Sequence, residues 1–133
     1  MRNVVLAAVI GILVAAGTLV AAPVAEADID LFCRPGCWGA IATSQSTGEE
    51  AIRLNYRTRH EAEDAAVLWC DVVGKTNDCQ VLTSGLGCLS IADNSDGKTS
   101  EARVAPNLDA ADAAALDGAG PGSTIGLHDC NDG

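Results

Sequence analysis

Cysteine is the residue type in this chain that is best placed to do chemistry. The sequence holds six cysteines, and an even number in a short exported chain predicts a framework of disulfides. Zinc binding by these thiols needs a reducing compartment, which the export signal described below contradicts. Redox chemistry is also disfavoured, because redox pairs usually have two residues between the cysteines and Cys33 and Cys37 have three. The full set is Cys33, Cys37, Cys70, Cys79, Cys88 and Cys130.

Nucleophilic catalysis has few candidate residues. His60 and His128 are the two histidines, and a triad would need one of them beside a nucleophile and an orienting acid. The G-x-S-x-G context of a nucleophile elbow is absent around Ser90, Ser95, Ser100 and Ser123. The sequence therefore predicts no catalytic residues and a protein that is not an enzyme. A small enzyme that uses one of the histidines is the alternative.

Two loops resemble ligand-binding motifs but lack residues that those motifs require. Residues 93–97, DNSDG, lack the alternating acids of a calcium loop and the Glu that should follow its glycine. A hairpin turn explains this stretch better. The glycine-rich residues 118–123 lack the Lys-Ser/Thr ending of a phosphate-binding loop. We therefore expect a plain linker there, and we predict no metal site and no cofactor.

The first part of the chain reads as a secretory signal peptide over residues 1–27. Arg2 supplies the positive charge, residues 4–22 form the apolar run, and Ala25-Glu26-Ala27 matches a cleavage site. The alternative is an uncleaved anchor, since the run is long enough to span a membrane. We expect cleavage, which leaves a secreted domain over residues 28–133, located outside the cell or in the cell envelope and free of the membrane.

The charge of the chain restricts its partners. Its formal net charge is −10, and such a surface repels the phosphates of nucleic acids and anionic lipids. We therefore expect neither as a partner, while a protein partner stays possible and the chain itself is expected to be a monomer. Aromatic residues are few, with two Trp, one Tyr and one Phe. A core of small residues buries little area, which makes covalent cross-links useful.

The chain repeats itself at a spacing of about 50 residues. Residues 38–42, WGAIA, correspond to 88–92, CLSIA, and each stretch is followed by a polar turn, an extended segment, an alanine-rich helix and a final strand. The units span about 37–84 and 87–130, and each reads β-β-α-β. We predict an α+β domain of two pseudo-symmetric units, joined by sharing a sheet or by packing helix against sheet.

The first helix carries the strongest local signals. Thr58 and Glu61 form a capping box, and Gly74 is the expected stop. Apolar residues at spacings of three and four predict the buried stripe, with Trp69 contributing most of the area near its end. In the second unit Asn107 is the expected cap. The predicted stripe consists of Ala62, Ala65, Ala66, Trp69 and Val73.

The repeat also indicates how the cysteines pair. In the repeat alignment, Cys70 corresponds to Gly118 and Cys79 falls near Ile125, so the second unit lacks both cysteines together. Paired loss predicts a mutual bridge, because one orphaned thiol is a liability outside the cell. We pair Cys88, at the start of the second unit, with Cys130 after its last strand, which clamps the C-terminus. Elimination then leaves Cys33 with Cys37, around a turn that contains Pro and Gly.

These motifs, in this order, resemble a known family. WGAIA, a Ser/Thr-Gly turn, EAExAA ending in Cys, DCxV and GCxxIA are similar to the small secreted bacterial domains called domain of unknown function 4189. The resemblance covers Trp38 to about Cys130. It implies an exported protein, of a kind often found in mycobacteria, and brings no catalytic residues. The second unit departs from the pattern, with Gly118 at the helix end where the family has cysteine.

The leading functional prediction is a secreted, non-catalytic interaction module. Its contact surface is expected on the acidic helix face, at Glu61 and Asp64, or on the glycine-rich loop, at Gly120 and Ser123. One alternative is an inhibitor of a cationic cell-wall or host hydrolase, in which acidic residues would occupy a basic cleft. Another is a structural protein associated with the envelope.

Overall fold

The computed structural model describes residues 36–132. The predicted signal peptide, and Cys33 with its predicted bridge, lie outside the described residues. The described chain forms six strands and two helices in the order β-β-α-β-β-β-α-β. They are β1 (Trp38–Ser44), β2 (Glu50–Tyr56), α1 (Arg59–Gly74), β3 (Cys79–Leu86), β4 (Cys88–Asp93), β5 (Ser100–Ala105), α2 (Leu108–Ala119) and β6 (Thr124–Cys130).

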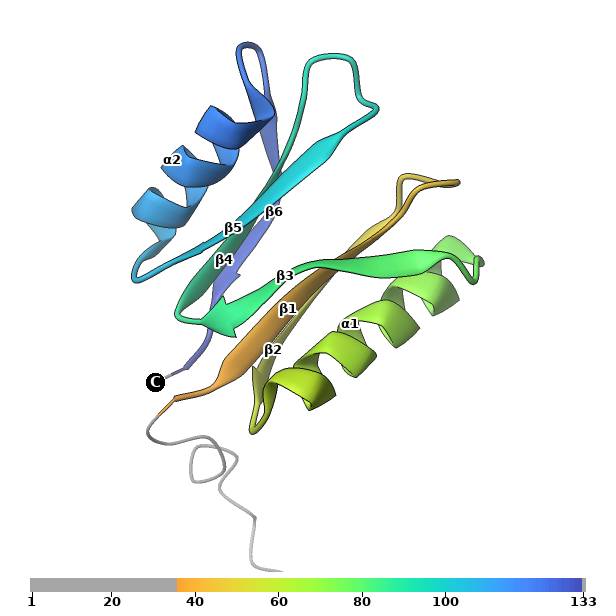
Figure 1. The fold of residues 1–133 in the computed structure, drawn as a ribbon, viewed down its shortest axis with the longest axis vertical. Helices are drawn as coiled ribbons and strands as arrows, with labels where there is room; N and C mark the ends of the chain where they lie inside the picture. The colour runs from red at the N-terminus through yellow and green to blue at the C-terminus, as the bar shows by residue number, and fades with distance from the viewer. Residues whose placement is uncertain (1–35, 133) are drawn as a thin grey trace, which may run out of the picture.

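The fold consists of four layers, helix, sheet, sheet and helix (Figure 1). One antiparallel sheet has the strand order β2-β1-β3 and is covered by α1, and the other has the order β5-β4-β6 and is covered by α2. The predicted α+β class and the two β-β-α-β units are confirmed. The expected way of joining the units is wrong, because they share no sheet and neither helix lies between them. Instead, the two sheets stack face to face.

Side-chain size explains this stacking. Ala40 and Ala42 of β1 point toward α1, whereas Ile41 between them points toward the other sheet. Leu89 and Ile91 of β4 point back toward Ile41. The larger residues thus lie between the sheets and the alanines lie beneath the helices. Apolar burial stabilises in proportion to the area removed from water. The larger side chains between the sheets therefore hold the two units together more strongly than a helix packed between the units would.

The registers of the two sheets match after a shift along the sequence, except that the pairing of β1 with β2 has an extra irregularity between Trp38 and Ala40. Ile41 lies opposite Ile52 and Thr83, and Ile91 lies opposite Ala102. The pairing of β1 with β3 shifts by one residue after Ile41, and that of β4 with β6 shifts at the equivalent place. Between the sheets, β1 contacts β4, β2 contacts β6 and β3 contacts β5, while β3 also contacts β4, which follows it in the chain. Exchanging the units maps the first three contacts onto themselves, as a pseudo-twofold axis requires.

The predicted stripe of α1 is partly wrong. The capping box is confirmed, since the Thr58 hydroxyl accepts from the Glu61 N–H and the Glu61 carboxylate accepts from the Thr58 N–H. The buried residues are Ala62, Ala66 and Cys70, whereas Trp69 is 49% exposed. Three small side chains one turn apart let the helix lie close to the alanines of the sheet. The bulky indole lies at the edge of this contact, where the Arg53 guanidinium covers it at 5.1 Å from the ring centroid.

The predicted stop of α1 is wrong by one residue. Gly74 is still helical, and Lys75 takes the left-handed conformation at φ 51° while its N–H donates to the carbonyl oxygen of Asp71. Gly74 serves close packing instead, because a Cβ there would meet the Glu49 Cβ at 2.9 Å. In the second unit the predicted cap is confirmed, since the Asn107 side chain accepts from the Ala110 N–H at 2.9 Å. Neither helix in residues 36–132 has the length and apolar character needed to cross a bilayer.

Candidate functional site

Two of the predicted disulfides are confirmed. Cys70 near the end of α1 is bonded to Cys79 at the start of β3, and Cys88 of β4 is bonded to Cys130 of β6. Cys37 is also disulfide-bonded, while its predicted pairing with Cys33 stays a prediction. The first bridge fixes the helix to its sheet and the second joins two neighbouring strands. Such bridges are typical of proteins that function outside a reducing cytosol.

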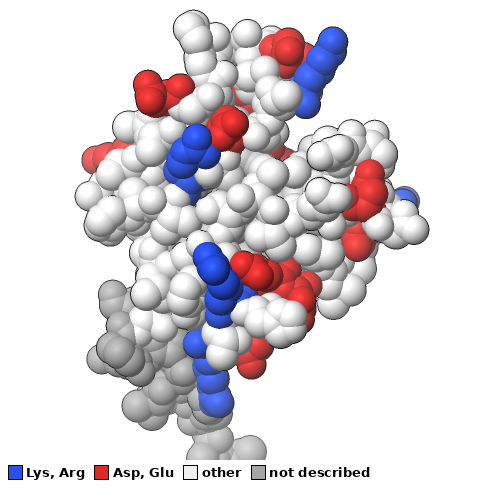
Figure 2. All heavy atoms as spheres, viewed as in Figure 1, with Lys and Arg blue, Asp and Glu red and all other residues white. Residues whose placement is uncertain are grey.

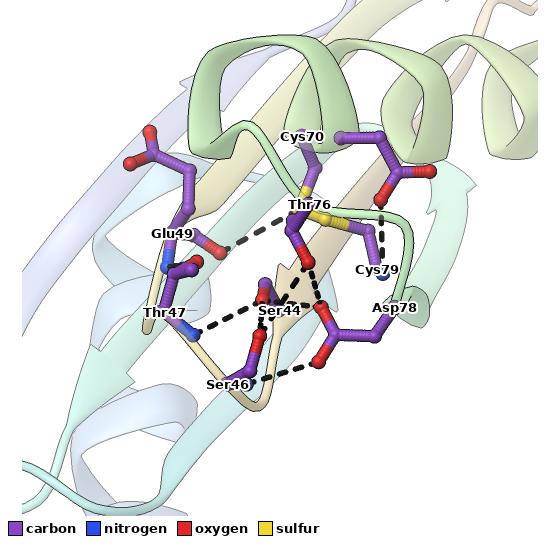
Figure 3. The surroundings of a disulfide bond; sticks show 9 residues. Ser44, Ser46, Thr47, Glu49, Cys70, Thr76, Asp78 and Cys79 are labelled. Atoms are coloured by element: carbon purple, nitrogen blue, oxygen red, sulfur yellow. Dashed lines mark hydrogen bonds between the residues drawn. A yellow bond between two sulfur atoms is a disulfide. The ribbon is translucent and has the colours of Figure 1, made fainter.

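A polar network surrounds the first bridge (Figure 3). The Asp78 carboxylate accepts from the hydroxyls of Ser44 and Thr76, each at 2.5 Å, and from the Ser46 N–H at 3.1 Å. The hydrogen bond from Ser44, followed by that from Thr76, holds the pKa of Asp78 well below its usual range. Both carboxylate oxygens are therefore engaged in fixing the β1–β2 turn to the loop before β3. We interpret this corner as structural.

The second unit replaces the bridge with a hydrogen bond. Counted from the two N-caps, Cys70 corresponds to Ala119, and counted from the strand registers, Cys79 corresponds to Ser123. The sequence alignment with Gly118 and Ile125 was therefore out of register, although both cysteines are indeed absent together. The Ser123 hydroxyl donates to the carbonyl oxygens of Leu116 at 3.2 Å and Gly120 at 2.7 Å. It thus ties the end of α2 to the start of β6.

The two histidines lie on different units. The His60 side chain is 85% exposed on α1 and lies 3.3 Å from the Asp64 carboxylate. His128 of β6 binds Asp112 of α2, with Nδ1 at 2.9 Å and 2.8 Å from the two carboxylate oxygens. Sequence reasoning missed this second pair, because its members are distant in the chain and only the fold brings them together.

His128 also lies opposite Ser90 on the neighbouring strand. A serine and a histidine of the second sheet and an aspartate of the helix that covers it thus lie near one another, which is the composition of a catalytic triad. However, Ser90 is completely buried, and its hydroxyl has no hydrogen-bond partner. A nucleophile must reach its substrate, and this hydroxyl is closed off beneath α2 in the described conformation.

The first unit contains an equivalent of the histidine pair. Ser84 takes the place of His128 in the strand register, and Glu63 takes the place of Asp112 relative to the helix N-cap. The Ser84 hydroxyl donates to the Glu63 carboxylate. Each unit therefore has a polar clamp between its last strand and its helix, which favours a structural role for His128.

Large exposed apolar side chains in residues 36–132 gather on one unit. Leu68 is 66% exposed and Val72 is 60% exposed on α1, and Val81 and Leu82 are exposed on the edge strand β3. A groove of about 440 Å³ runs between the helix and this strand. Acidic side chains gather over α1, beside uncharged surface (Figure 2). The groove is lined by His60, Glu63, Asp64, Val67, Leu68, Asp71 and Val81.

A second groove lies at the end of α2. Its volume is about 490 Å³, and Leu116, Asp117, Gly120, Pro121 and Ser123 line it. It contains two of the residues predicted as a partner surface, while the first groove contains Asp64. The remaining predicted residue, Glu61, forms the capping box of α1. The structure therefore does not bring the four residues together, and their role in binding stays a prediction.

Comparison with known families decides which family the chain belongs to. A family profile described as "Domain of unknown function (DUF4189)" matches residues 38–130. The chain belongs to the DUF4189 family. The resemblance drawn from the sequence is thereby confirmed. No curated protein and no solved structure matches the chain.

The DUF4189 domain accounts for both units, since the match begins at the first residue of β1 and ends at the last residue of β6. Within the described residues, no group of three His, Cys, Asp or Glu side chains is placed to hold a metal ion. The described surface has two grooves. Of these, the α1–β3 groove of the DUF4189 domain combines exposed apolar area with acidic groups.

Proposed function

We propose that this DUF4189 protein is a secreted, non-catalytic interaction module whose α1–β3 groove binds a cationic, amphipathic segment of another protein. One observation carries the proposal. Within residues 36–132, all the large apolar side chains that are strongly exposed lie on α1 and β3. Clustered exposed apolar area on a small domain is a mark of an interaction site.

The fold itself does not require this apolar surface. Relative to the N-caps, Leu68 of α1 corresponds to Asp117 of α2, and Trp69 corresponds to Gly118. The second helix also contacts all three strands of its sheet, and it has no apolar residue at these two positions. The first unit therefore carries apolar side chains that its own core does not use.

The charges beside the groove indicate the chemistry of the partner. Asp64 is exposed, and His60 is the one charged side chain of residues 36–132 that lies beside its carboxylate. This carboxylate is therefore available to a cation. Asp71 accepts from the Cys79 N–H and adds a second negative charge to the rim, whereas the charge of Glu63 is compensated by Arg59 at 3.3 Å. A segment with apolar residues on one side and Lys or Arg beside them would satisfy both features.

Export is the second part of the proposal. The two disulfides between described residues favour an oxidising compartment, and the sequence of residues 1–27 has the features of a signal peptide. A secreted module with these bridges is cross-linked within each of its two units.

The test uses a synthetic amphipathic helix of Leu and Lys as the probe, titrated against the oxidised domain at low and high salt. We expect saturable binding at low salt, weaker binding at high salt, and NMR shifts confined to α1 and β3. Peptides with Lys replaced by Glu, or Leu replaced by Ser, should bind at least tenfold more weakly. Shifts confined to the end of α2, or the absence of saturable binding, would overturn the proposal.

Matched variants locate the surface. Leu68→Ser combined with Val72→Ser should weaken peptide binding about tenfold or more, because it removes apolar area from the groove. Asp64→Lys should also weaken binding, whereas Asp117→Lys makes the same charge change in the second groove and should leave binding unchanged. The opposite result for the two lysine variants would assign the partner to the end of α2.

The acidity of the chain favours a second candidate function, inhibition of a cationic hydrolase. A formal net charge of −10 would attract a basic active-site cleft over long range at low salt. Assays with a lysozyme-type hydrolase at low and high salt test this candidate. Inhibition at low salt would support it, and full activity at low salt with excess domain would remove it.

A further inference from the structure

Two carboxyl groups from different units lie together at one end of the interface between the sheets. Glu50 begins β2 in the first unit, and Asp93 ends β4 in the second. Both lie next to Gly126 of β6, where a Cβ would meet Glu50 Oε2 at 2.6 Å and Asp93 Oδ2 at 3.3 Å. Because Gly126 has no side chain, there is room for the Glu50 carboxyl group beside β6.

The hydrogen bonds of this group are incomplete. The Ser100 hydroxyl donates to Asp93 Oδ1 at 2.6 Å. Glu50 Oε1 is buried and has no hydrogen-bond partner. A buried carboxylate without a donor is costly, and a neighbouring carboxylate adds repulsion, so the neutral form of Glu50 is favoured. Burial, followed by the charge of Asp93 and hydrogen bonding with it, raises the pKa of Glu50 to about 7.

The groups around Glu50 come from several elements. Asp93 of β4 and Glu49 of the preceding turn raise its pKa by their negative charge, while hydrogen bonding with Ser100 of β5 lowers it. Gly126 of β6 and Thr43, which is paired with Glu50 on β1, have no titratable side chain. The balance of these contacts favours one proton held at the pair.

The repeat supplies an internal comparison. In the two registers, Glu50 corresponds to Ser100, Asp93 to Thr43, and Gly126 to Leu82. The pseudo-twofold copy of this place therefore contains no carboxyl group at the matching positions. The copy lies beside the acid pair, since Thr43 is the strand partner of Glu50 and Ser100 is the strand partner of Asp93.

We propose that Glu50 and Asp93 form a pH-dependent joint between the two repeat units, closed by a shared proton in acid and loosened by repulsion when both groups ionise. The joint is independent of the groove on α1. Because the folded protein holds a proton that the unfolded chain releases at the usual Glu pKa, the stabilisation is complete below about pH 4.5 and is lost as the pH rises to about 7.

The first test is urea unfolding of the oxidised domain between pH 5 and pH 8.5. We expect the unfolding equilibrium constant to rise with pH, by up to about tenfold per unit as one-proton linkage requires, and to level off above about pH 7. Glu50→Gln cannot ionise and should remove this rise. The second variant is Glu50→Ser, which places at this position the residue that the other unit has, Ser100. It should remove the rise as well. Asp117→Asn removes an exposed acid elsewhere and should keep the rise.

The second test locates the change. Amide hydrogen exchange, corrected for its intrinsic pH dependence, should increase around Ser100 and Gly126 between pH 6 and pH 8 in the wild type. It should stay constant in both Glu50 variants and, in the wild type, around Gly39 and Leu89 near the opposite end of the two central strands. A pH dependence that survives in both Glu50 variants, or a change spread evenly over the two ends of the interface, would overturn the proposal.

Discussion

Ser123 in the second unit occupies the place that Cys79 occupies in the first. Gln80 lies opposite Thr43, and Thr124 lies opposite Asp93, the equivalent residue of the second unit. The residues just before them, Cys79 and Ser123, are therefore equivalent too. Cys79 is bonded to Cys70 of α1, and the Ser123 hydroxyl donates to carbonyl oxygens at the end of α2. One corner of the fold is thus held by a covalent bond and its copy by hydrogen bonds.

This relationship predicts that the first unit can fold without its bridge. Cys70→Ala with Cys79→Ser copies Ala119 and Ser123, so the double variant should keep the native fold. It should lose about 2.7 kcal/mol of unfolding free energy by the loop-closure model, measured by urea denaturation. The control is the single Cys79→Ser variant, which leaves an unpaired thiol. A double variant without cooperative unfolding would contradict the equivalence of the two corners.

Ser90 and Ala40 provide a reciprocal prediction. They are equivalent residues of the two central strands, both fully buried, and the Ser90 hydroxyl has no hydrogen-bond partner. Ser90→Ala should therefore raise the unfolding free energy by about 1 kcal/mol, and Ala40→Ser should lower it by about 1–3 kcal/mol.

Chemical denaturation of both variants measures these changes. A loss of stability in Ser90→Ala would mean that the hydroxyl has a partner in solution. His128, on the facing strand, would then be the first residue to examine.

The end of α1 distinguishes two roles of glycine. Gly74→Ala should lower the unfolding free energy by about 1 kcal/mol, because the clash of its Cβ with Glu49 outweighs the better helix propensity of alanine. Lys75→Gly should raise it by about 0.5–1 kcal/mol, because Lys75 has a positive φ that glycine adopts without strain. Thermal unfolding of the pair is the measurement. A stabilised Gly74→Ala variant would restore Gly74 as the helix stop.

Local sequence signals predicted much of this fold. The capping box at Thr58, the cap at Asn107 and the two β-β-α-β units depend on contacts close in the sequence or on internal repetition. The pairing of Cys70 with Cys79 also followed from the repeat. These features were predictable because each is read within one unit.

Features that depend on contacts between distant segments were not predictable in the same way. Alternation in β1 indicates two buried faces, but only the assembled sheets show that Ile41 meets Leu89 and Ile91 rather than a helix. Trp69 fits the helical period yet lies beside the contact, because alanine side chains set the spacing beneath α1. The groove likewise arises where α1 and β3 lie side by side, and the sequence alone does not show that these two elements are neighbours.

The clamps between strand and helix offer a last prediction, which separates a structural from a chemical role of His128. His128 binds Asp112 in the second unit, as Ser84 binds Glu63 in the first. His128→Ala and Asp112→Ala should each lose about 1 kcal/mol of unfolding free energy, and the double-mutant cycle should give a coupling of similar size.

Asp112→Glu combined with His128→Ser transplants the first clamp and should unfold within about 0.5 kcal/mol of the wild type, since the longer acid meets the shorter hydroxyl as it does in the first unit. Zero coupling in the cycle, or a transplant as unstable as the alanine variants, would show that His128 is present for a reason other than holding α2 to its sheet.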